Sequence, residues 1–343
     1  MKLNGQPTRS IMRTADAKGA RILDQRRLPW EVVWVELRDA PTVARAIREM
    51  WTRGAPLLAM TGAYGLAMAL ADDPSDANLI ASRAMLNATR PTAVNLCWAL
   101  DEIVAAVRPL PVEQRAEAAF ARADAIVEED VCLSRAIGEH GLSLLRALHA
   151  NHPDRPLNIL THCNAGWLAT ADYGTATAPM YMAHDAGLPL HIWVDETRPR
   201  NQGALLTAFE LSEHDIAHTV ITDNAGGHLI QRGQVDAVIV GADRVTANGD
   251  VCNKIGTYLK ALAAHDNGVP FYVALPHTTF DAATASGDLI PIEERGGDEV
   301  TWVEGEGGRV RITRSSAANP AFDVTPARLV TGYITERGVL ARP

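Results

Sequence analysis

The sequence predicts an α/β protein whose two halves differ in texture, and two observations support that prediction. Residues 151–343 alternate short apolar runs with helical segments, which is typical of a mostly parallel sheet covered on both faces. Residues 1–150 combine one short β section with long helical patterns. Because 343 residues are enough for two domains, we expect a small mixed N-terminal domain, 1–150, and a larger C-terminal domain, 151–343.

The N-terminal half is expected to hold few strands. Alternating residues and a Leu-Pro break over 21–37 predict a β hairpin. Apolar residues at helical spacing predict helices over 41–51, 91–107 and 112–148, the first with Pro41 in its opening turn. The most apolar run, 56–71, is shorter than the roughly 18 residues of a membrane span. It is rich in small residues and is predicted to be a buried helix.

Five short apolar runs predict the strands of the C-terminal sheet: 157–162, 190–195, 218–223, 236–243 and 270–276. In an open α/β sheet, ligands bind at the carboxyl ends of the strands. Reading these ends in turn yields side chains suited to acid–base chemistry: His162, Cys163, Asp195, Glu196, Asp223, Asp243 and His277.

Composition excludes several function classes. A net charge of -9 without any basic run argues against nucleic-acid and membrane-surface partners, and 47% hydrophobic residues indicate a globular protein. The first residues contain no apolar segment of a signal peptide. The four cysteines are widely spaced and form no CxxC pair, so reduced thiols in the cytoplasm are expected.

Cys163 and Asp243 are the candidate catalytic residues. Cys163 lies at a predicted strand end before a turn of small residues, where a thiol acts as acid, base or nucleophile. The alternative is a buried structural thiol. Asp243 ends a strongly apolar strand, where partial burial suits a proton-transferring carboxylate. Its alternative is a helix cap or a salt bridge with Arg244.

Several predicted helix starts carry groups that suit an anion. Lys254 is predicted in the first turn of a helix that begins at Asn253, where a cation opposes the helix dipole unless it faces a bound phosphate; the alternative is a lysine turned to solvent. Arg53 and Gly54 precede the helix at Pro56, and Arg90 precedes another. Neither a P-loop nor a dinucleotide fingerprint is present, and the histidines lack metal-ligand spacing. The residues alone therefore predict a cytosolic enzyme acting on a phosphorylated small molecule.

The sequence resembles the family of methylthioribose-1-phosphate isomerases, the aldose–ketose isomerases of methionine salvage. The matching stretches span most of the chain and include "RPTAVNL", "THCNAG", "VDETRPRNQGA", "GADRVTANGDVCNKIGTY" and "NPAFDVTP". The wider superfamily includes ribose-1,5-bisphosphate isomerase and the regulatory subunits of an initiation factor's exchange complex.

This resemblance implies a fold, a reaction and a set of site residues. The fold is a small N-terminal domain of a few strands and a helical bundle, with a larger Rossmann-like C-terminal domain. The reaction is conversion of 5-methylthioribose 1-phosphate to 5-methylthioribulose 1-phosphate by a homodimer without metal or organic cofactor. Cys163 and Asp243 are the implied catalytic pair. The implied substrate contacts are Arg53, Gly54, Ala55, Arg90, Gln202, Asn253 and Lys254.

Other functions remain open at this point. One is isomerisation of 5-deoxyribose 1-phosphate or ribose 1,5-bisphosphate. Another is a non-catalytic regulatory subunit that binds sugar phosphates, against which the joint presence of Cys163, Asp243 and Lys254 argues. The choice between an enediol path and a hydride shift is also open.

Overall fold

The structure, a computed structural model, describes residues 1–90 and 93–341, which fall into two compact units. Unit 1 comprises Met1, Pro7–Ser134 and Trp167–Gly174; unit 2 comprises Lys2–Gln6, Arg135–Gly166 and Thr175–Pro343. The division falls inside one long helix, α5 (Val112–His149). The domains 1–150 and 151–343 stay a prediction.

Unit 1 is a three-stranded antiparallel sheet with a group of helices. Strands β3 (Ile11–Arg13), β4 (Ala20–Leu23) and β5 (Trp34–Leu37) pair in that order, which confirms the predicted hairpin. The helices are α1 (Ala40–Arg48), α2 (Ala55–Asp72), α3 (Asp76–Asn87), α4 (Val94–Val107) and the first part of α5. Asp39 caps α1 by accepting from the Thr42 N–H at 2.6 Å, with proline in the first turn as predicted.

Helix α2 lies in the core of unit 1. By length and composition it could cross a membrane, but 78% of its apolar window is buried inside the protein, which confirms the predicted core helix. Small residues let its neighbours approach: a Cβ at Gly62 would lie 2.3 Å from the Leu96 side chain of α4.

Unit 2 is built on a seven-stranded sheet, and the expected fold class is confirmed. All five predicted strands are present as β6 (Leu157–Thr161), β7 (Leu190–Asp195), β8 (His218–Ile221), β9 (Ala237–Val240) and β12 (Phe271–Ala274). They pair in parallel in the order β12-β9-β6-β7-β8. The sheet continues past β12 with β17 (Gly332–Thr335), parallel, and β18 (Gly338–Leu340), antiparallel.

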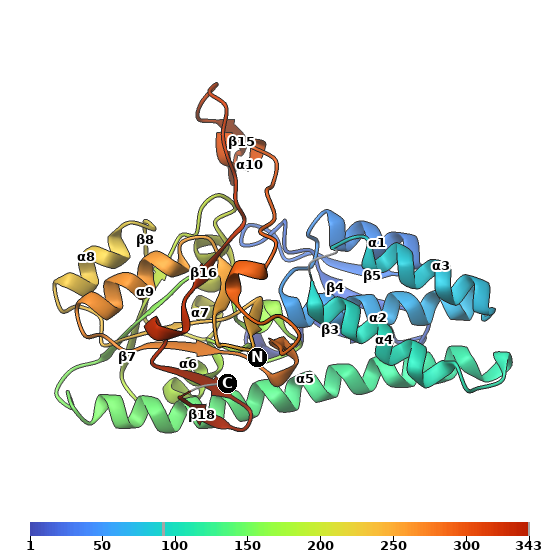
Figure 1. Cartoon of the computed structure of the whole chain (residues 1–343), viewed down its shortest axis with the longest axis horizontal. Helices are drawn as coiled ribbons and strands as arrows, with labels where there is room; N and C mark the ends of the chain where they lie inside the picture. Colours follow the sequence, from blue (N-terminus) through green and yellow to red (C-terminus); the bar gives the residue numbers. More distant parts are fainter. Residues whose placement is uncertain (91–92, 342–343) are drawn as a thin grey trace. The chain divides into compact units, whose positions relative to one another are not determined.

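Helices cover both faces of this sheet. Figure 1 shows α8 (Ala225–Gln231) and α9 (Thr257–Asp266) on one face, and α6 (Ala178–Asp185) with the second part of α5 on the other. After β7 the chain forms a π-helix, Gly203–Thr207, that runs into α7 (Ala208–Glu213). Apolar side chains from strands and helices form one core, which includes Leu160, Val238, Val273 and Ala261.

Smaller sheets complete the chain. Strands β13 (Phe280–Asp281), β10 (Arg244–Thr246), β11 (Val251–Lys254) and β16 (Phe322–Thr325) form a four-stranded sheet in that order. A short helix, α10 (Asp298–Thr301), leads into the hairpin of β14 (Trp302–Gly305) and β15 (Gly308–Arg311), which extends away from the seven-stranded sheet in Figure 1. Near the N-terminus, β1 (Lys2–Leu3) pairs with β2 (Gln6–Pro7).

The predicted helix start at Asn253 is wrong. Asn253 and Lys254 are the last residues of β11, and α9 begins at Thr257 after Gly256 in a left-handed conformation with φ 103°. Asn248-Gly249 is a strong hairpin signal, and here it joins β10 to β11 as an antiparallel pair. The dipole argument for Lys254 therefore does not apply.

Candidate functional site at the ends of β6 and β9

The two candidate catalytic residues follow neighbouring parallel strands. Successive strands β6, β7 and β8 run toward one edge of the sheet, whereas β9, β12 and β17 run toward the other. The order therefore reverses between β6 and β9, and a crevice at such a reversal is where open α/β sheets bind ligands. Cys163 comes two residues after β6 and Asp243 three residues after β9, and both are half-buried.

The loops that carry these residues touch each other. A Cβ built on Gly241 would lie 2.6 Å from the Cβ of Ala165, which is too short for two non-bonded carbon atoms. Only glycine therefore fits at this contact, which lies two residues from Cys163 on one loop and two residues from Asp243 on the other. The Asp243 backbone is held in turn by its N–H, which donates to the Cys252 carbonyl at 2.9 Å.

The backbone of Cys163 is held in an uncommon conformation. Its φ is 65°, in the left-handed region that residues with a Cβ seldom adopt. Its N–H donates to Thr197 Oγ1 at 2.8 Å, and its carbonyl accepts from Thr207 Oγ1 at 2.7 Å. Both peptide groups beside the thiol are thus bound to buried threonine hydroxyls.

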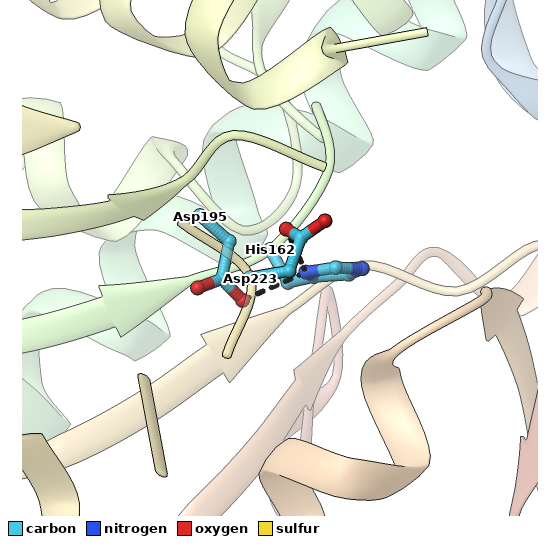
Figure 2. Close-up of side chains that lie close together, drawn as sticks. All are labelled: His162, Asp195 and Asp223. Atoms are coloured by element: carbon cyan, nitrogen blue, oxygen red, sulfur yellow. Dashed lines mark hydrogen bonds and ion pairs between the residues drawn. The ribbon is translucent and has the colours of Figure 1, made fainter. Parts of the chain in front are cut away.

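A buried ion cluster underlies this loop. His162 Nδ1 lies 2.8 Å from Asp195 Oδ2, and its Nε2–H donates to the carbonyl of Ile255 at 2.8 Å. Figure 2 shows the carboxylates of Asp195 and Asp223 both directed toward Nδ1 of the imidazole, with Asp223 Oδ1 at the longer distance of 4.0 Å. Lys260 Nζ binds Asp195 Oδ2 at 3.0 Å and also donates to the Asp223 carbonyl. The side chain of Asp195 is fully buried, so its pairing with the Lys260 ammonium offsets part of the cost of removing the carboxylate from water.

Three of these side chains could be considered as metal ligands. Atoms of His162, Asp195 and Asp223 lie within 4.8 Å of one another. However, Asp195 Oδ2 already receives the Lys260 ammonium, which supplies the positive charge that a metal would bring. The arrangement fits a hydrogen-bonded ion cluster better than a metal centre.

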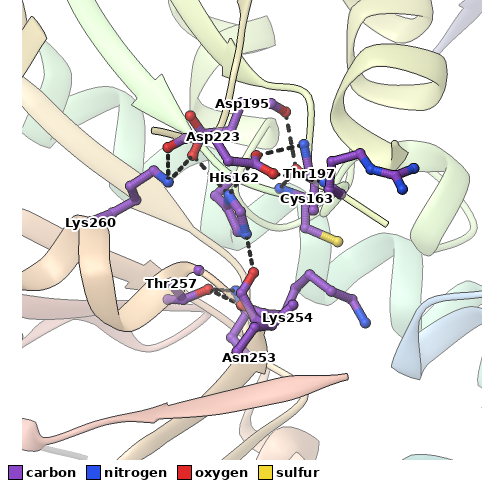
Figure 3. Close-up of polar contacts among 12 residues, drawn as sticks. His162, Cys163, Asp195, Thr197, Asp223, Asn253, Lys254, Thr257 and Lys260 are labelled. Carbon is purple, nitrogen blue, oxygen red and sulfur yellow. Dashed lines mark hydrogen bonds and ion pairs between the residues drawn. The ribbon is translucent and has the colours of Figure 1, made fainter. Parts of the chain in front are cut away.

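Asn253 and Lys254 are the last two residues of β11, and their side chains have different partners. The Asn253 amide donates to Thr257 Oγ1 at 3.0 Å, and Lys254 Nζ donates to the Ala321 carbonyl at 3.0 Å. In Figure 3 the Lys254 amine and the Cys163 thiol lie on the same side of His162. The neighbouring Cys252 is no candidate nucleophile, because burial, assisted by the charge of Asp243, raises its thiol pKa to about 12.

Gln202 lies at the start of the π-helix and is 6% exposed. Among residues 1–90 and 93–341, its Oε1 has no hydrogen-bond partner. A buried acceptor without a partner is costly unless a ligand or water satisfies it. This position is therefore suited to a ligand that donates a hydrogen bond.

The remaining predicted contacts belong to unit 1. Gly54 is the N-cap of α2 with φ 94°, and a Cβ there would lie 2.6 Å from that of Ala169, so the position requires glycine. Ala55 opens α2, and Arg53 precedes it, half-buried. Arg90 is also half-buried; Pro91 and Thr92 of the same motif lie outside the described residues.

Sequence reasoning missed Thr197, Thr207 and Lys260. Thr197 has a φ of 65°, and Thr207 is the last residue of the π-helix. Neither the positive φ nor the π-helix could be predicted from the residue types at these positions. Asp195 and Asp223 were expected at the strand ends, and they do lie there, but their hydrogen bonds to His162 and to the loop after β7 depend on the folded chain.

Comparison with known proteins places this geometry in a family. The sequence model of the Initiation factor 2 subunit family matches residues 51–342. The chain belongs to that family. Its relatives include a methylthioribose-1-phosphate isomerase from Rhizobium meliloti, 59% identical over 99% of this chain and 96% of that protein. The protein of that name from Gluconobacter oxydans is 59% identical over 98% of this chain and 95% of its own length.

Two solved structures have the same fold. The 5-methylthioribose 1-phosphate isomerase from Pyrococcus horikoshii superposes with a TM-score of 0.84 and 38% identity, covering 97% of this chain and 92% of that one. A protein from A. fulgidus described as translation initiation factor eIF-2B, subunit delta, has a TM-score of 0.82 and 38% identity, covering 97% and 96%. The fold is thus shared by proteins named as enzymes and as translation factors, so function has to be argued from the site.

Proposed function

We propose that this protein isomerises 5-methylthio-α-D-ribose 1-phosphate to 5-methylthio-D-ribulose 1-phosphate, a step of methionine salvage. The observation that carries the proposal is the juxtaposition of the Cys163 and Asp243 loops at the strand-order reversal, in contact through Ala165 and Gly241. The names of the full-length relatives support the same reaction.

The substrate determines what the two side chains must do. Its phosphate is on the anomeric oxygen, so opening the ring breaks the bond between C1 and the ring oxygen while the phosphate stays attached. Asp243 in its acid form donates a proton to the ring oxygen, which leaves C1 electron-poor. The resulting Asp243 carboxylate then accepts the proton of the C2 hydroxyl as C2 becomes the ketone.

Two paths are open for the hydrogen on C2. In a hydride shift it moves to C1 with its electron pair, and Cys163 provides polar support. In an enediol path Cys163 removes it as a proton, the C2–H electrons form a double bond between C1 and C2, and the proton returns to C1. The reaction in D2O separates them, because deuterium at C1 of the product indicates an enediol, and its absence indicates a hydride shift or a shielded proton carrier.

Substrate contacts complete the proposal. We assign Gln202, Asn253 and Lys254 to contacts with the sugar phosphate. The contacts expected from Arg53, Gly54, Ala55 and Arg90 stay a prediction. Lys254 offers an ammonium and Gln202 a buried acceptor without a protein partner among the described residues, which suit a phosphate and a sugar hydroxyl respectively. Fixing the substrate this way raises the rate through orientation.

Replacement of the proposed catalytic residues tests the assignment. Cys163→Ser and Asp243→Asn should each lower kcat by about 10²–10⁴-fold. Cys132→Ser, which changes an exposed thiol on α5, is the matched control and should keep wild-type turnover. Near-normal activity of either first variant would show that the residue is not catalytic. Turnover of the 5-deoxyribose and ribose 1,5-bisphosphate analogues, measured alongside, defines the substrate.

The remaining features of the proposal concern the form in which the protein works. We infer a cytoplasmic homodimer that needs no metal or organic cofactor and binds neither nucleic acid nor membrane. Sedimentation velocity should give the mass of two chains. Activity should survive extensive dialysis against a chelator, and a loss that a divalent metal restores would contradict the cofactor-free mechanism.

A further inference from the structure

We propose that Thr197 and Thr207 are positioning residues whose hydroxyls fix the backbone of Cys163 and thereby aim its thiol. We call these two hydroxyl groups the threonine clamp. The inference rests on the proposed function, in which Cys163 acts on the sugar, but it assigns a role to residues outside the catalytic pair. Figure 3 shows Thr197 beside Cys163.

The hydrogen bonds of the clamp leave each hydroxyl a single orientation. Thr197 Oγ1 accepts from the Cys163 N–H at 2.8 Å and donates its own proton to the Asp195 carbonyl at 3.0 Å. Thr207 Oγ1 donates to the Cys163 carbonyl at 2.7 Å and accepts from the Asn164 amide at 3.1 Å. A hydroxyl has one proton to give, and in each case it goes to a carbonyl oxygen that can only accept.

Burial makes these bonds hard to replace. Thr197 is 0% exposed and Thr207 1% exposed, so water cannot readily substitute for a lost hydroxyl. Without these hydroxyls, the N–H and the carbonyl of Cys163 would each lose a hydrogen-bond partner. The left-handed conformation of Cys163 would then have less to hold it, because residues with a Cβ ordinarily favour negative φ.

Thr197 also connects the thiol to the loop that bears Gln202. The N–H groups of Thr197 and Arg198 donate to the two carboxylate oxygens of Asp223, each at 2.7 Å. The same loop continues to Gln202, a proposed substrate contact. The clamp therefore sets the thiol relative to a group that holds the substrate, which is the geometry that an orientation effect requires.

Isosteric replacement tests the clamp by kinetics. Thr197→Val and Thr207→Val keep side-chain shape and remove the hydroxyl. Each should lower kcat by about 10–100-fold with KM changed by less than about threefold, since a displaced reacting group affects the chemical step more than binding. Thr197→Ser, made in the wild-type chain, keeps the hydroxyl and should have a kcat close to that of the wild type. The control is Thr325→Val, at a residue 0% exposed whose hydroxyl has no hydrogen-bond partner among the described residues.

A second measurement does not depend on turnover. Iodoacetamide alkylation of Cys163, followed by mass spectrometry of its peptide, reports how firmly the thiol is held. We expect the rate to rise by about threefold or more in Thr197→Val and to stay at the wild-type value in Thr325→Val. Should the wild-type protein fail to convert the sugar phosphate, the proposed function falls, and the alkylation rates still decide whether the clamp exists.

Two results would overturn the proposal. One is that both valine variants keep kcat and the alkylation rate at the values of Thr325→Val. The other is a fall in kcat that also occurs in Thr197→Ser, because packing of the γ-methyl group would then be responsible instead of the hydroxyl. Unfolding temperatures of all variants, measured in parallel, detect any variant that fails to fold. If neither valine variant folds, Thr197→Ser decides the question: a kcat and an alkylation rate close to wild type support the clamp, and a loss of kcat overturns it.

Discussion

Replacing Asp130 with asparagine should make the protein more stable at neutral pH. Asp130 lies on α5 within unit 1, is 8% exposed, and accepts a hydrogen bond from the Ala171 N–H at 2.7 Å. Burial, with a smaller contribution from the charge of Asp172, raises its pKa from 3.8 to about 7. Asparagine preserves the shape and the acceptor oxygen but carries no charge to bury.

The size of the effect follows from the pKa difference between the folded and unfolded states. Below pH 3.8 both states are protonated and the protonated carboxyl makes its full contribution to stability. As pH rises toward 7 the unfolded state releases its proton while the folded state retains it, so stability falls. A difference of about three units corresponds to a loss of roughly 4 kcal/mol in the free energy of unfolding, complete above pH 7.

Urea denaturation at pH 5 and pH 8 measures this loss. The stabilisation by Asp130→Asn, relative to wild type, should be larger at pH 8 than at pH 5 by about 2–3 kcal/mol. Glu117→Gln, an exposed carboxyl on the same helix, is the control and should show no such difference. A stability difference between Asp130→Asn and wild type that is the same at both pH values would refute the reasoning.

Three further substitutions test other parts of the structure. Gly241→Ala places a Cβ 2.6 Å from the Cβ of Ala165 and should lower kcat at least about tenfold, because it separates the two catalytic loops. The control is Gly227→Ala, whose Cβ would make an ordinary contact at 3.7 Å and should leave kcat unchanged. Equal kcat values in the two variants would contradict the contact between the loops. Gly54→Ala places a side chain at a φ of 94° and puts its Cβ 2.6 Å from the Cβ of Ala169. It should lower the free energy of unfolding, measured by urea titration, by at least about 1–3 kcal/mol. Unchanged stability would argue against the tight packing. Lys260→Met leaves Asp195 buried without its cation and should cost about 3–5 kcal/mol, part of which Asp195→Asn in the same chain should recover; additive losses in the double-mutant cycle would exclude the coupling.

The sequence by itself determined the elements whose signal is local. The five strands of the parallel sheet were predicted because each is a short, nearly continuous apolar run. Such runs are typical of parallel strands, since helices cover both faces of the sheet and the side chains on both faces are buried. Helix α2 was predicted as a core helix from its small apolar residues. The candidate residues Cys163 and Asp243 followed from the general rule that strand ends carry the site, together with the resemblance to a known family.

Other features depend on which segments meet in the folded chain. Whether β6 lies beside β9 is decided by pairing between strands far apart in the sequence, and this pairing brings the Cys163 and Asp243 loops into contact. Lys254 was predicted in the first turn of a helix that begins at Asn253, but pairing of β11 with β10 and β16 places it at the end of a strand. The threonine clamp and the raised pKa of Asp130 arise from burial by distant segments. Hydrogen bonding and desolvation depend on distances in space, and these exist only once the tertiary structure has formed.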